Sequence, residues 1–350
     1  MRSKKLIVAF LWVILCPVTG NAAAQELDIK ELVFEHIGDS YSWHITKIGD
    51  TEIAIPLPVL VKSRQNGWQL FLSSRLGHGN PYKGLYITHE GAYAGKIVER
   101  DVTGKEVRPA IDISITKNAA ALMISCIVLL LVIMPLARWY KHGTMKPAKG
   151  FKGVVEMLLA DIHDDVIKVC VGEDYKRFSP YLLTAFFFIF INNLMGLIPL
   201  FPGGANVTGN IAVTMVLALC TFFTVNLFGN KAYWKEILWP DVPAWLKVPA
   251  PIMPVIELFG IFTKPLALMI RLFANIMAGH SVMLGLFCLI FITASMGAAC
   301  NAGMSALSIL FTCFMTFVEL LVAYIQAYVF TLLSSVFIGM ARTGHTTHKH

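Results

Sequence analysis

Long apolar runs, separated by polar or glycine-rich connections, occupy most of the chain after residue 118. Residues 119–137, 181–200 and 210–229 carry no charged side chain. Each run is close to the length of about 20 residues that an α-helix needs to cross a bilayer. We therefore predict three membrane-crossing helices over these ranges.

Two longer apolar stretches follow, from about 251 to 296 and from 304 to 341, with no clear turn inside either. A helix of 38 residues measures roughly 57 Å, whereas the hydrocarbon of a bilayer is roughly 30 Å thick. Two crossings within 38 residues would leave nothing for a connection. We therefore expect two long, steeply tilted helices that form an antiparallel hairpin near Cys300, which brings the predicted crossings to five.

The segment 153–172 has a different pattern, in which apolar and polar residues alternate at helical spacing. This pattern predicts an amphipathic helix on the cytoplasmic membrane surface. We interpret the acidic residues as a solvated face in preference to a metal site. The apolar side comprises Val155, Leu158, Leu159, Ile162, Val166, Val169 and Cys170, and the polar side Asp161, Asp164, Asp165 and Lys168.

The N-terminal part resembles neither pattern. Residues 1–24 have a basic start, an 11-residue apolar core and small residues up to Ala24, which is typical of a cleaved secretory signal. Residues 25–117 contain short segments such as TEIAIPLPVLV, GWQLFLSS and GLYITHE, bounded by Gly and Pro. These segments predict a small β-rich exported domain, whose role the pattern does not define.

Composition and charge support a membrane protein. Only 15% of the 350 residues are charged, against about 25% in soluble domains. Basic residues concentrate between the first two predicted spans and after the third, whereas 201–207 and 297–303 carry no charge. The positive-inside rule then places the basic connections and the tail 342–350 in the cytoplasm, and residues 25–117 in the periplasm of a bacterial inner membrane. The net charge of +7 thus sets topology and does not indicate nucleic-acid binding.

Arg271 lies deep inside the first long stretch, with about twenty apolar-rich residues before it and twenty-five after it. An arginine at membrane depth costs at least about 2.5–3.5 kcal/mol, and its guanidinium does not lose its proton. Because the helix ends are far away, the side chain cannot easily reach the headgroups. We interpret Arg271 as a functional cation.

The predicted hairpin places further polar residues at matching heights. Arg271 falls opposite Gln326, and His280 falls opposite Glu319. Asn275 shares a helix face with Arg271 because the two are four residues apart. A histidine and a glutamate can relay protons near neutral pH, whereas an arginine acts as a fixed charge.

Four segments resemble subunit a of the rotary F-type ATP synthase. PVIELFGIFTKPLALMIRLFANIMAGH and FVELLVAYIQAYVFTLL are similar to the two signature segments of that family, and NNLMGLIP (192–199) and ANVTGNIAVT (205–214) to its earlier spans. The resemblance covers about 119–341 and leaves out 25–117. It implies a membrane domain over 118–341 that acts as a stator, lines two proton half-channels against a ring of c subunits, and assembles with b subunits, the rest of the complex and membrane lipid.

The resemblance also implies roles for individual residues. Arg271 takes the place of the essential arginine of the family, with Gln326 and Asn275 as its polar neighbours. Glu257 matches an acidic position of the cytoplasmic half-channel, and Asn193 a position that lines the outer half-channel.

Two departures from the family pattern stand out. Many bacterial members carry Glu where His280 stands and His where Glu319 stands, and the acid of the family after NLM is replaced by Gly196. Because His280 and Glu319 are predicted to be neighbours, the exchange should preserve a proton relay between them.

Two other classes of protein fit the sequence less well. A secondary ion transporter would also use intramembrane Arg, His and Glu, but the sequence shows no inverted repeat or pair of broken helices. A passive membrane scaffold would not need polar pairs at two depths. The chain has no Walker-type phosphate loop, and its seven cysteines show no metal-ligand spacing. We therefore predict a proton-channel subunit without a nucleotide, cofactor or metal site of its own.

Overall fold

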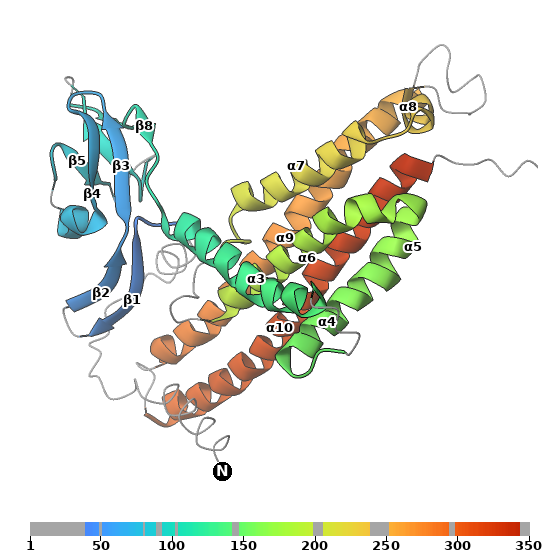
Figure 1. Ribbon diagram of the computed structural model, residues 1–350. Helices are drawn as coiled ribbons and strands as arrows, with labels where there is room; N and C mark the ends of the chain where they lie inside the picture. The colour runs from blue at the N-terminus through green and yellow to red at the C-terminus, as the bar shows by residue number, and fades with distance from the viewer. Residues whose placement is uncertain are drawn as a thin grey trace, which may run out of the picture.

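The computed structural model describes residues 39–48, 51–79, 81–88, 93–101, 104–141, 147–198, 206–238, 252–293 and 298–343. The predicted signal sequence and most of the predicted tail lie outside these residues. The described chain forms a β-rich N-terminal part and a helical part (Figure 1).

The helical part begins with α3, which follows the last strand directly. Among the described residues, four helical stretches are long and apolar enough to cross a membrane, namely Lys117–Lys141, Phe151–Leu197, Val255–Ile290 and Cys300–Arg342. α7, the third predicted span, has 17 residues and falls short of that length. The helices are α3 (Lys117–Lys141), α4 (Phe151–Ala160), η2 (Asp161–Ile167), α5 (Lys168–Val171), η3 (Gly172–Asp174), α6 (Tyr175–Leu197), α7 (Ile211–Leu227), α8 (Lys231–Leu238), α9 (Ile252–Thr293) and α10 (Ala298–Thr343).

The stretch Phe151–Leu197 consists of two helical arms that run in opposite directions (Figure 1). The chain turns at Gly172, whose φ of 75° is accessible mainly to glycine. Before this turn, α4, η2 and α5 form the predicted amphipathic helix, with Val155, Ile162 and Val166 buried. Their buried face packs against α6 and α10. Val169 was expected on this face but is 72% exposed, because it lies on the side of α5 that faces away from the packed helices.

The two longest helices, α9 and α10, lie side by side over much of their length (Figure 1). They contain 42 and 46 residues, which correspond to roughly 63 and 69 Å of helix. The hydroxyl of Ser308 on α10 donates to the carbonyl of Leu286 on α9. Both helices pack on the core around α6, where Leu182, Phe186 and Leu272 are almost fully buried.

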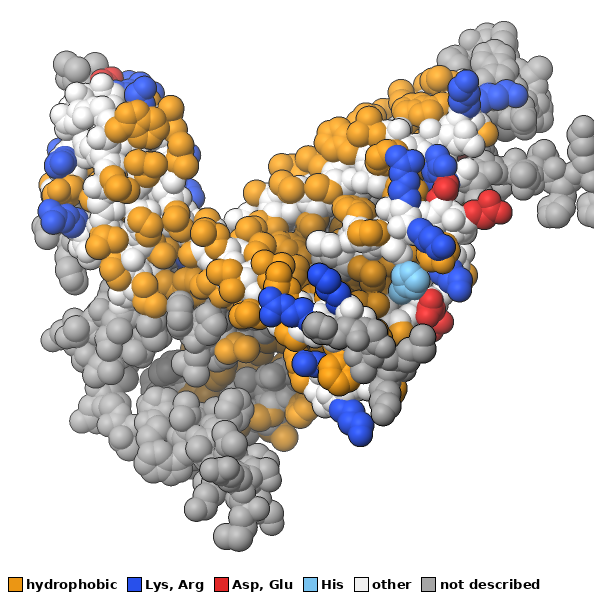
Figure 2. Space-filling model, viewed as in Figure 1, with side chains coloured by type: hydrophobic (Ala, Val, Ile, Leu, Met, Phe, Trp, Pro, Cys, Tyr) orange, Lys and Arg blue, Asp and Glu red, His pale blue; other side chains and the backbone are white. Residues whose placement is uncertain are grey.

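The outer surface of the helical part is largely apolar on the face that Figure 2 shows. Large side chains such as Leu131, Phe223, Leu310 and Phe317 are more than half exposed. In an aqueous protein such a surface would be unfavourable, because exposed apolar area orders water. An apolar surface around helices of this length is what a lipid environment requires.

The N-terminal part consists of short antiparallel strands, as predicted. Strand β1 pairs with β2, and the other strands form sheets of order β4-β3-β8 and β5-β6-β7. The predicted segment 51–61 contains β2 and most of β3, the segment 67–74 contains β4, and the segment 84–90 contains β5. The strands are β1 (Ser42–Ile48), β2 (Thr51–Pro56), β3 (Pro58–Ser63), β4 (Gly67–Leu72), β5 (Leu85–Ile87), β6 (Ile97–Arg100), β7 (Glu106–Val107) and β8 (Ile111–Asp112), and the short helix η1 spans Ser73–Gly79.

A small core joins the two larger sheets of this part. Val59, Val61, Phe71, Leu85 and Ile97 are buried together. On β3 the buried residues alternate with exposed ones, as expected for a strand with one face toward a core. The inner face of the sheet β4-β3-β8 is therefore occupied by the protein's own residues.

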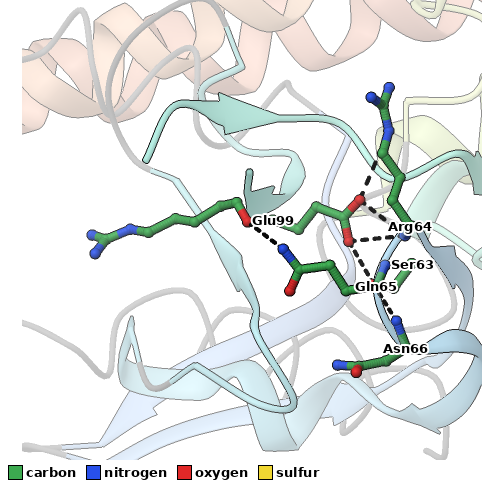
Figure 3. Close-up of polar contacts among 6 residues, drawn as sticks. Ser63, Arg64, Gln65, Asn66 and Glu99 are labelled. Carbon is green, nitrogen blue, oxygen red and sulfur yellow. Dashed lines mark hydrogen bonds and ion pairs between the residues drawn. The ribbon is translucent and has the colours of Figure 1, made fainter. Parts of the chain in front are cut away.

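A buried carboxylate fastens the turn between β3 and β4 to β6 (Figure 3). Glu99, which is 4% exposed, accepts a 2.6 Å hydrogen bond from the hydroxyl of Ser63 and bonds from the backbone N–H of Arg64 at 3.1 and 3.2 Å. The Nε atom of Arg64 lies 3.9 Å from Glu99 Oε1. These partners compensate for the desolvation of the charge, which would otherwise disfavour folding.

The N-terminal part is attached directly to the start of α3. The backbone N–H of Lys117 donates to the carbonyl of Ser40 at 2.8 Å, and that of Asn118 to Oδ1 of Asp39 at 3.0 Å. Trp43 packs in one cluster with Ala121 of α3 and with Val207, just before α7. The β-rich part thus contacts the beginnings of two helices.

Candidate functional site

One of the two polar pairs expected between the long helices forms where α6, α9 and α10 converge. His280 of α9 and Glu319 of α10 lie opposite each other, with 3.3 Å between His280 Nδ1 and Glu319 Oε1. Their side chains are 15% and 6% exposed. Both groups can bind or release a proton, so the contact joins two titratable side chains inside the helical part.

Glycines shape the space around this pair. A Cβ atom added to Gly279 would lie 2.8 Å from Glu319 Oε1, closer than real contacts allow. Gly196 of α6 lies on the other side of the ring, where an added Cβ would be 3.5 Å from His280 Nε2. Gly196 therefore faces His280 directly.

Asn193 lies one turn of α6 before Gly196 and is 3% exposed. Its side-chain nitrogen donates to the carbonyl of Ala323 on α10 at 3.2 Å. Its Oδ1 atom is buried and accepts no hydrogen bond from the part of the chain that the structure describes. Because Ala323 is one turn from Glu319, the polar positions of α6 and α10 follow the same seam between the two helices.

The structure does not join Arg271 to Gln326, although their register suggested a pair. Arg271 is exposed on α9, and it makes no hydrogen bond or ion pair with any described residue. Gln326 is 7% exposed and points into the packed helices. The next residue, Leu272, is buried, whereas Arg271 and Asn275, one turn later, are both exposed on the part of the helix surface that the described core does not cover.

Glu257 lies near the start of α9, apart from the His280 pair. Its charge acts on Tyr233 of α8, where burial, and then the Coulombic effect of Glu257, raise the pKa of the tyrosine hydroxyl. Tyr233 also donates a long 3.5 Å hydrogen bond to Asn226. These two residues line a small pocket together with Lys264, whose ammonium lies 5.6 Å from the ring centroid of Phe337. Sequence reasoning missed this pocket because its members come from separate helices.

A chain of buried hydroxyl groups was also missed. The hydroxyl of Tyr181 on α6 lies 2.8 Å from that of Thr221 on α7, which lies 3.2 Å from that of Ser334 on α10. Single Ser and Thr residues in apolar helices give no charge signal, although such bonds hold helices together in membranes. These hydroxyl groups link α6, α7 and α10.

Taken together, the long apolar helices and the enclosed titratable pair define a multi-pass membrane protein with a polar site inside its helix bundle. Comparison with known proteins identifies its family. A family model described as "ATP synthase A chain" matches residues 120–339. The chain therefore belongs to the ATP synthase A chain family. A second model, described as a domain of unknown function, matches residues 32–120.

Individual relatives agree with this assignment. An "ATP synthase subunit a" of Chlorobium phaeobacteroides (strain DSM 266 / SMG 266 / 2430) is 39% identical over 283 residues, which cover 78% of this chain and 79% of the relative. That of Pelodictyon phaeoclathratiforme is 41% identical over 248 residues, 68% of this chain and 69% of the relative. That of Anaeromyxobacter sp. (strain Fw109-5) is 38% identical over 266 residues, 72% of this chain and 60% of the relative.

Proposed function

We propose that this protein is the stator subunit of the membrane sector of a rotary ATP synthase, and that it forms two proton half-channels against a ring of c subunits. Membership of the ATP synthase A chain family supports this assignment. The observation that carries it is the outward-facing Arg271, a fixed cation on a long apolar helix whose charge is not paired within the described chain. A carboxylate on another subunit would supply the anionic partner for this cation.

The energies favour a carboxylate as this partner. An arginine at membrane depth costs at least about 2.5–3.5 kcal/mol. A carboxylate 4 Å away recovers about 4 kcal/mol at an effective dielectric of 20. A ring carboxylate that has lost its proton would therefore bind opposite Arg271, and a protonated one would move on into lipid, where an ionised group would be expensive.

The proposed route begins at the end of α6. A proton enters from outside past Asn193 and passes through Glu319 and His280 to a ring carboxylate. After nearly a full turn of the ring, the proton leaves near Glu257. Arg271, with Asn275 and Gln326 close to it in the register of the two helices, separates the two half-channels. A transmembrane potential of 100 mV supplies about 2.3 kcal/mol of driving force per proton.

The charge distribution supports an orientation in the membrane. Lys and Arg side chains gather along one edge of the helical part, from α8 past the start of α6 to the end of α3 (Figure 2). We assign this edge and the tail 342–350 to the cytoplasm. In this assignment residues 1–24 are removed and residues 25–117 are periplasmic. The membrane domain 118–341 then crosses five times, α7 included, with α9 and α10 as a tilted hairpin, and b subunits join it in the peripheral stalk.

ATP-driven acidification of inverted membrane vesicles tests this function. In vesicles that carry Arg271→Ala we expect acidification to fall to background while the complex remains assembled. Arg177→Ala is the matched control, because Arg177 is another exposed arginine, near the start of α6. Its guanidinium lies 4.5 Å from the ring centroid of Phe228. Unchanged pumping by Arg271→Ala would overturn the assignment and favour a passive scaffold. Transport that continues without the c ring would favour a secondary transporter.

A further inference from the structure

The outer face of the sheet β4-β3-β8 is apolar, although the sheet belongs to the exported part. In an antiparallel sheet, residues directly opposite each other point to the same side. The strand register therefore assigns a set of side chains to the face away from the core. These "outer-face residues" form three rows, Trp68, Lys62 and Ile111, then Leu70, Leu60 and Ile113, then Leu72, Pro58 and Ile115.

The outer-face residues are extensively exposed. Leu70 is 73% exposed, Ile113 59%, Trp68 55% and Leu72 49%. A solvated antiparallel sheet normally carries polar residues on its outer face, and contiguous apolar patches of this kind mark interaction sites. Because the inner face is filled by the core and by the Glu99 contacts, the outer face remains free for a contact outside the described chain.

The chemistry of this face matches the boundary between lipid and water. Lys62 is the only charged member of the outer-face residues, and its ammonium lies 5.7 Å from the ring centroid of Trp68. Tryptophan is enriched at membrane interfaces, and lysine extends its charge to the headgroups while its stem covers apolar surface. The face contains no acidic side chain that anionic lipid would repel.

The attachment of the sheet holds this face close to the membrane. Ile113 and Ile115 donate backbone hydrogen bonds to Leu60 and Pro58 at 3.0 and 3.1 Å. The next element, α3, begins at Lys117, only two residues after Ile115. Figure 1 shows β8 leading through a short connection into the start of α3. The row of Leu72, Pro58 and Ile115 is therefore nearest to the point where α3 enters the membrane.

We propose that the outer-face residues rest on the phospholipid surface of the outer leaflet, with Leu70, Ile113 and Trp68 among the acyl chains and Lys62 on a phosphate. The face would fix the exported part flat against the bilayer. This inference requires α3 to cross the membrane but does not require the proton-channel role. Loss of pumping in the Arg271→Ala test and lipid contact of the sheet are therefore independent results.

Spin labelling of the assembled complex tests the proposal. The native cysteines are replaced, a nitroxide is attached at Leu70→Cys, and the complex is reconstituted in vesicles of phosphatidylethanolamine and phosphatidylglycerol. Collision rates are measured with oxygen, which concentrates in lipid, and with a water-soluble nickel chelate. We expect the ratio of oxygen to nickel collisions to be severalfold higher at position 70 than at the control Lys105→Cys, an exposed site between β6 and β7.

A second label at Trp68→Cys repeats the measurement at another outer-face residue, so that a local distortion at position 70 cannot by itself decide the result. Both side chains are exposed, so their replacement opens no cavity in the core. Lipid contact at both positions supports the proposal. High nickel access at both would show a face open to water and overturn it. Low access to both reagents would show a protein surface over the face, from this chain or another subunit, and would overturn it equally.

Discussion

His280 Nδ1 and Glu319 Oε1 lie 3.3 Å apart at the contact between α9 and α10. The two residues are 39 positions apart in the sequence, yet they form one enclosed unit next to Gly196 of α6. Because the contact is direct, the identity of the residue on each helix matters less than the presence of one imidazole and one carboxyl. We therefore expect this pair to tolerate an exchange of the two residues.

Exchanging the two residues tests this relationship. Glu319→Gln removes one proton-binding group, and we expect ATP-driven pumping to fall on the order of 10²-fold, the low end of the cost of losing a positioned proton-transfer group. The double variant His280→Glu with Glu319→His should recover much of this loss. Pumping of each single variant and of the double variant in inverted vesicles measures the coupling. A double variant no better than the worse single variant would contradict a shared relay.

Gly279 is predicted to be necessary for the position of Glu319. An added methyl group at Gly279 would lie 2.8 Å from the carboxylate and displace it, so Gly279→Ala should slow proton pumping. Gly285→Ala on the same helix is the control, because a Cβ atom added to Gly285 would meet nothing within 4 Å. In the control, alanine is expected to stabilise the helix by about 0.5–1 kcal/mol without affecting pumping. Equal effects of the two substitutions would argue against a role for the space beside Glu319.

Glu99 is predicted to stabilise the β-rich N-terminal part. Glu99→Ala would leave the Ser63 hydroxyl and the Arg64 amide without their acceptor, at a cost of about 1–3 kcal/mol. The urea concentration at which the strands become sensitive to pulse proteolysis, in the full-length protein in detergent, measures this loss. Glu106 is an exposed acid on β7, and Glu106→Ala should change the free energy of unfolding by less than about 0.5 kcal/mol. If the two variants unfold alike, the contacts in Figure 3 do not hold the turn.

The β-rich N-terminal part should lose stability in acid through Asp112. Burial acts to raise the pKa of this carboxyl, but hydrogen bonds from Ser114 and from the Tyr41 hydroxyl at 2.7 Å, together with the charge of Arg108, lower it overall. A lowered folded pKa stabilises the fold above the unfolded value of about 3.9, and this contribution disappears as pH falls through the folded pKa.

Tyr41→Phe removes one of these hydrogen bonds. We expect acid unfolding of the strands to move to higher pH in this variant, as followed by proteolysis with an acid-active protease. Tyr93→Phe, which alters an exposed tyrosine, should leave the midpoint unchanged. An unaltered midpoint in Tyr41→Phe would show that the bond to Asp112 makes no contribution.

The helices and their approximate limits could be predicted from local pattern. In lipid the backbone of each apolar stretch must satisfy its own hydrogen bonds, so a run of about 20 or more apolar residues becomes a helix whatever its neighbours are. The same reasoning placed His280 opposite Glu319, since two helices joined by a short turn are antiparallel. Alternation of apolar residues likewise predicted strands in the N-terminal part.

The rotation of each element about its own axis depended on the packing of the whole chain. Arg271 and Gln326 are level in the register, yet α9 turns Arg271 outward while α10 buries Gln326, because the side chains around α6 select which faces meet. The same packing placed Gly196 beside His280 and left Val169 exposed. Sequence thus determined which segments are helices or strands, since this depends on neighbouring residues. Only the tertiary structure decided which side chains touch, since these contacts depend on how distant surfaces fit together.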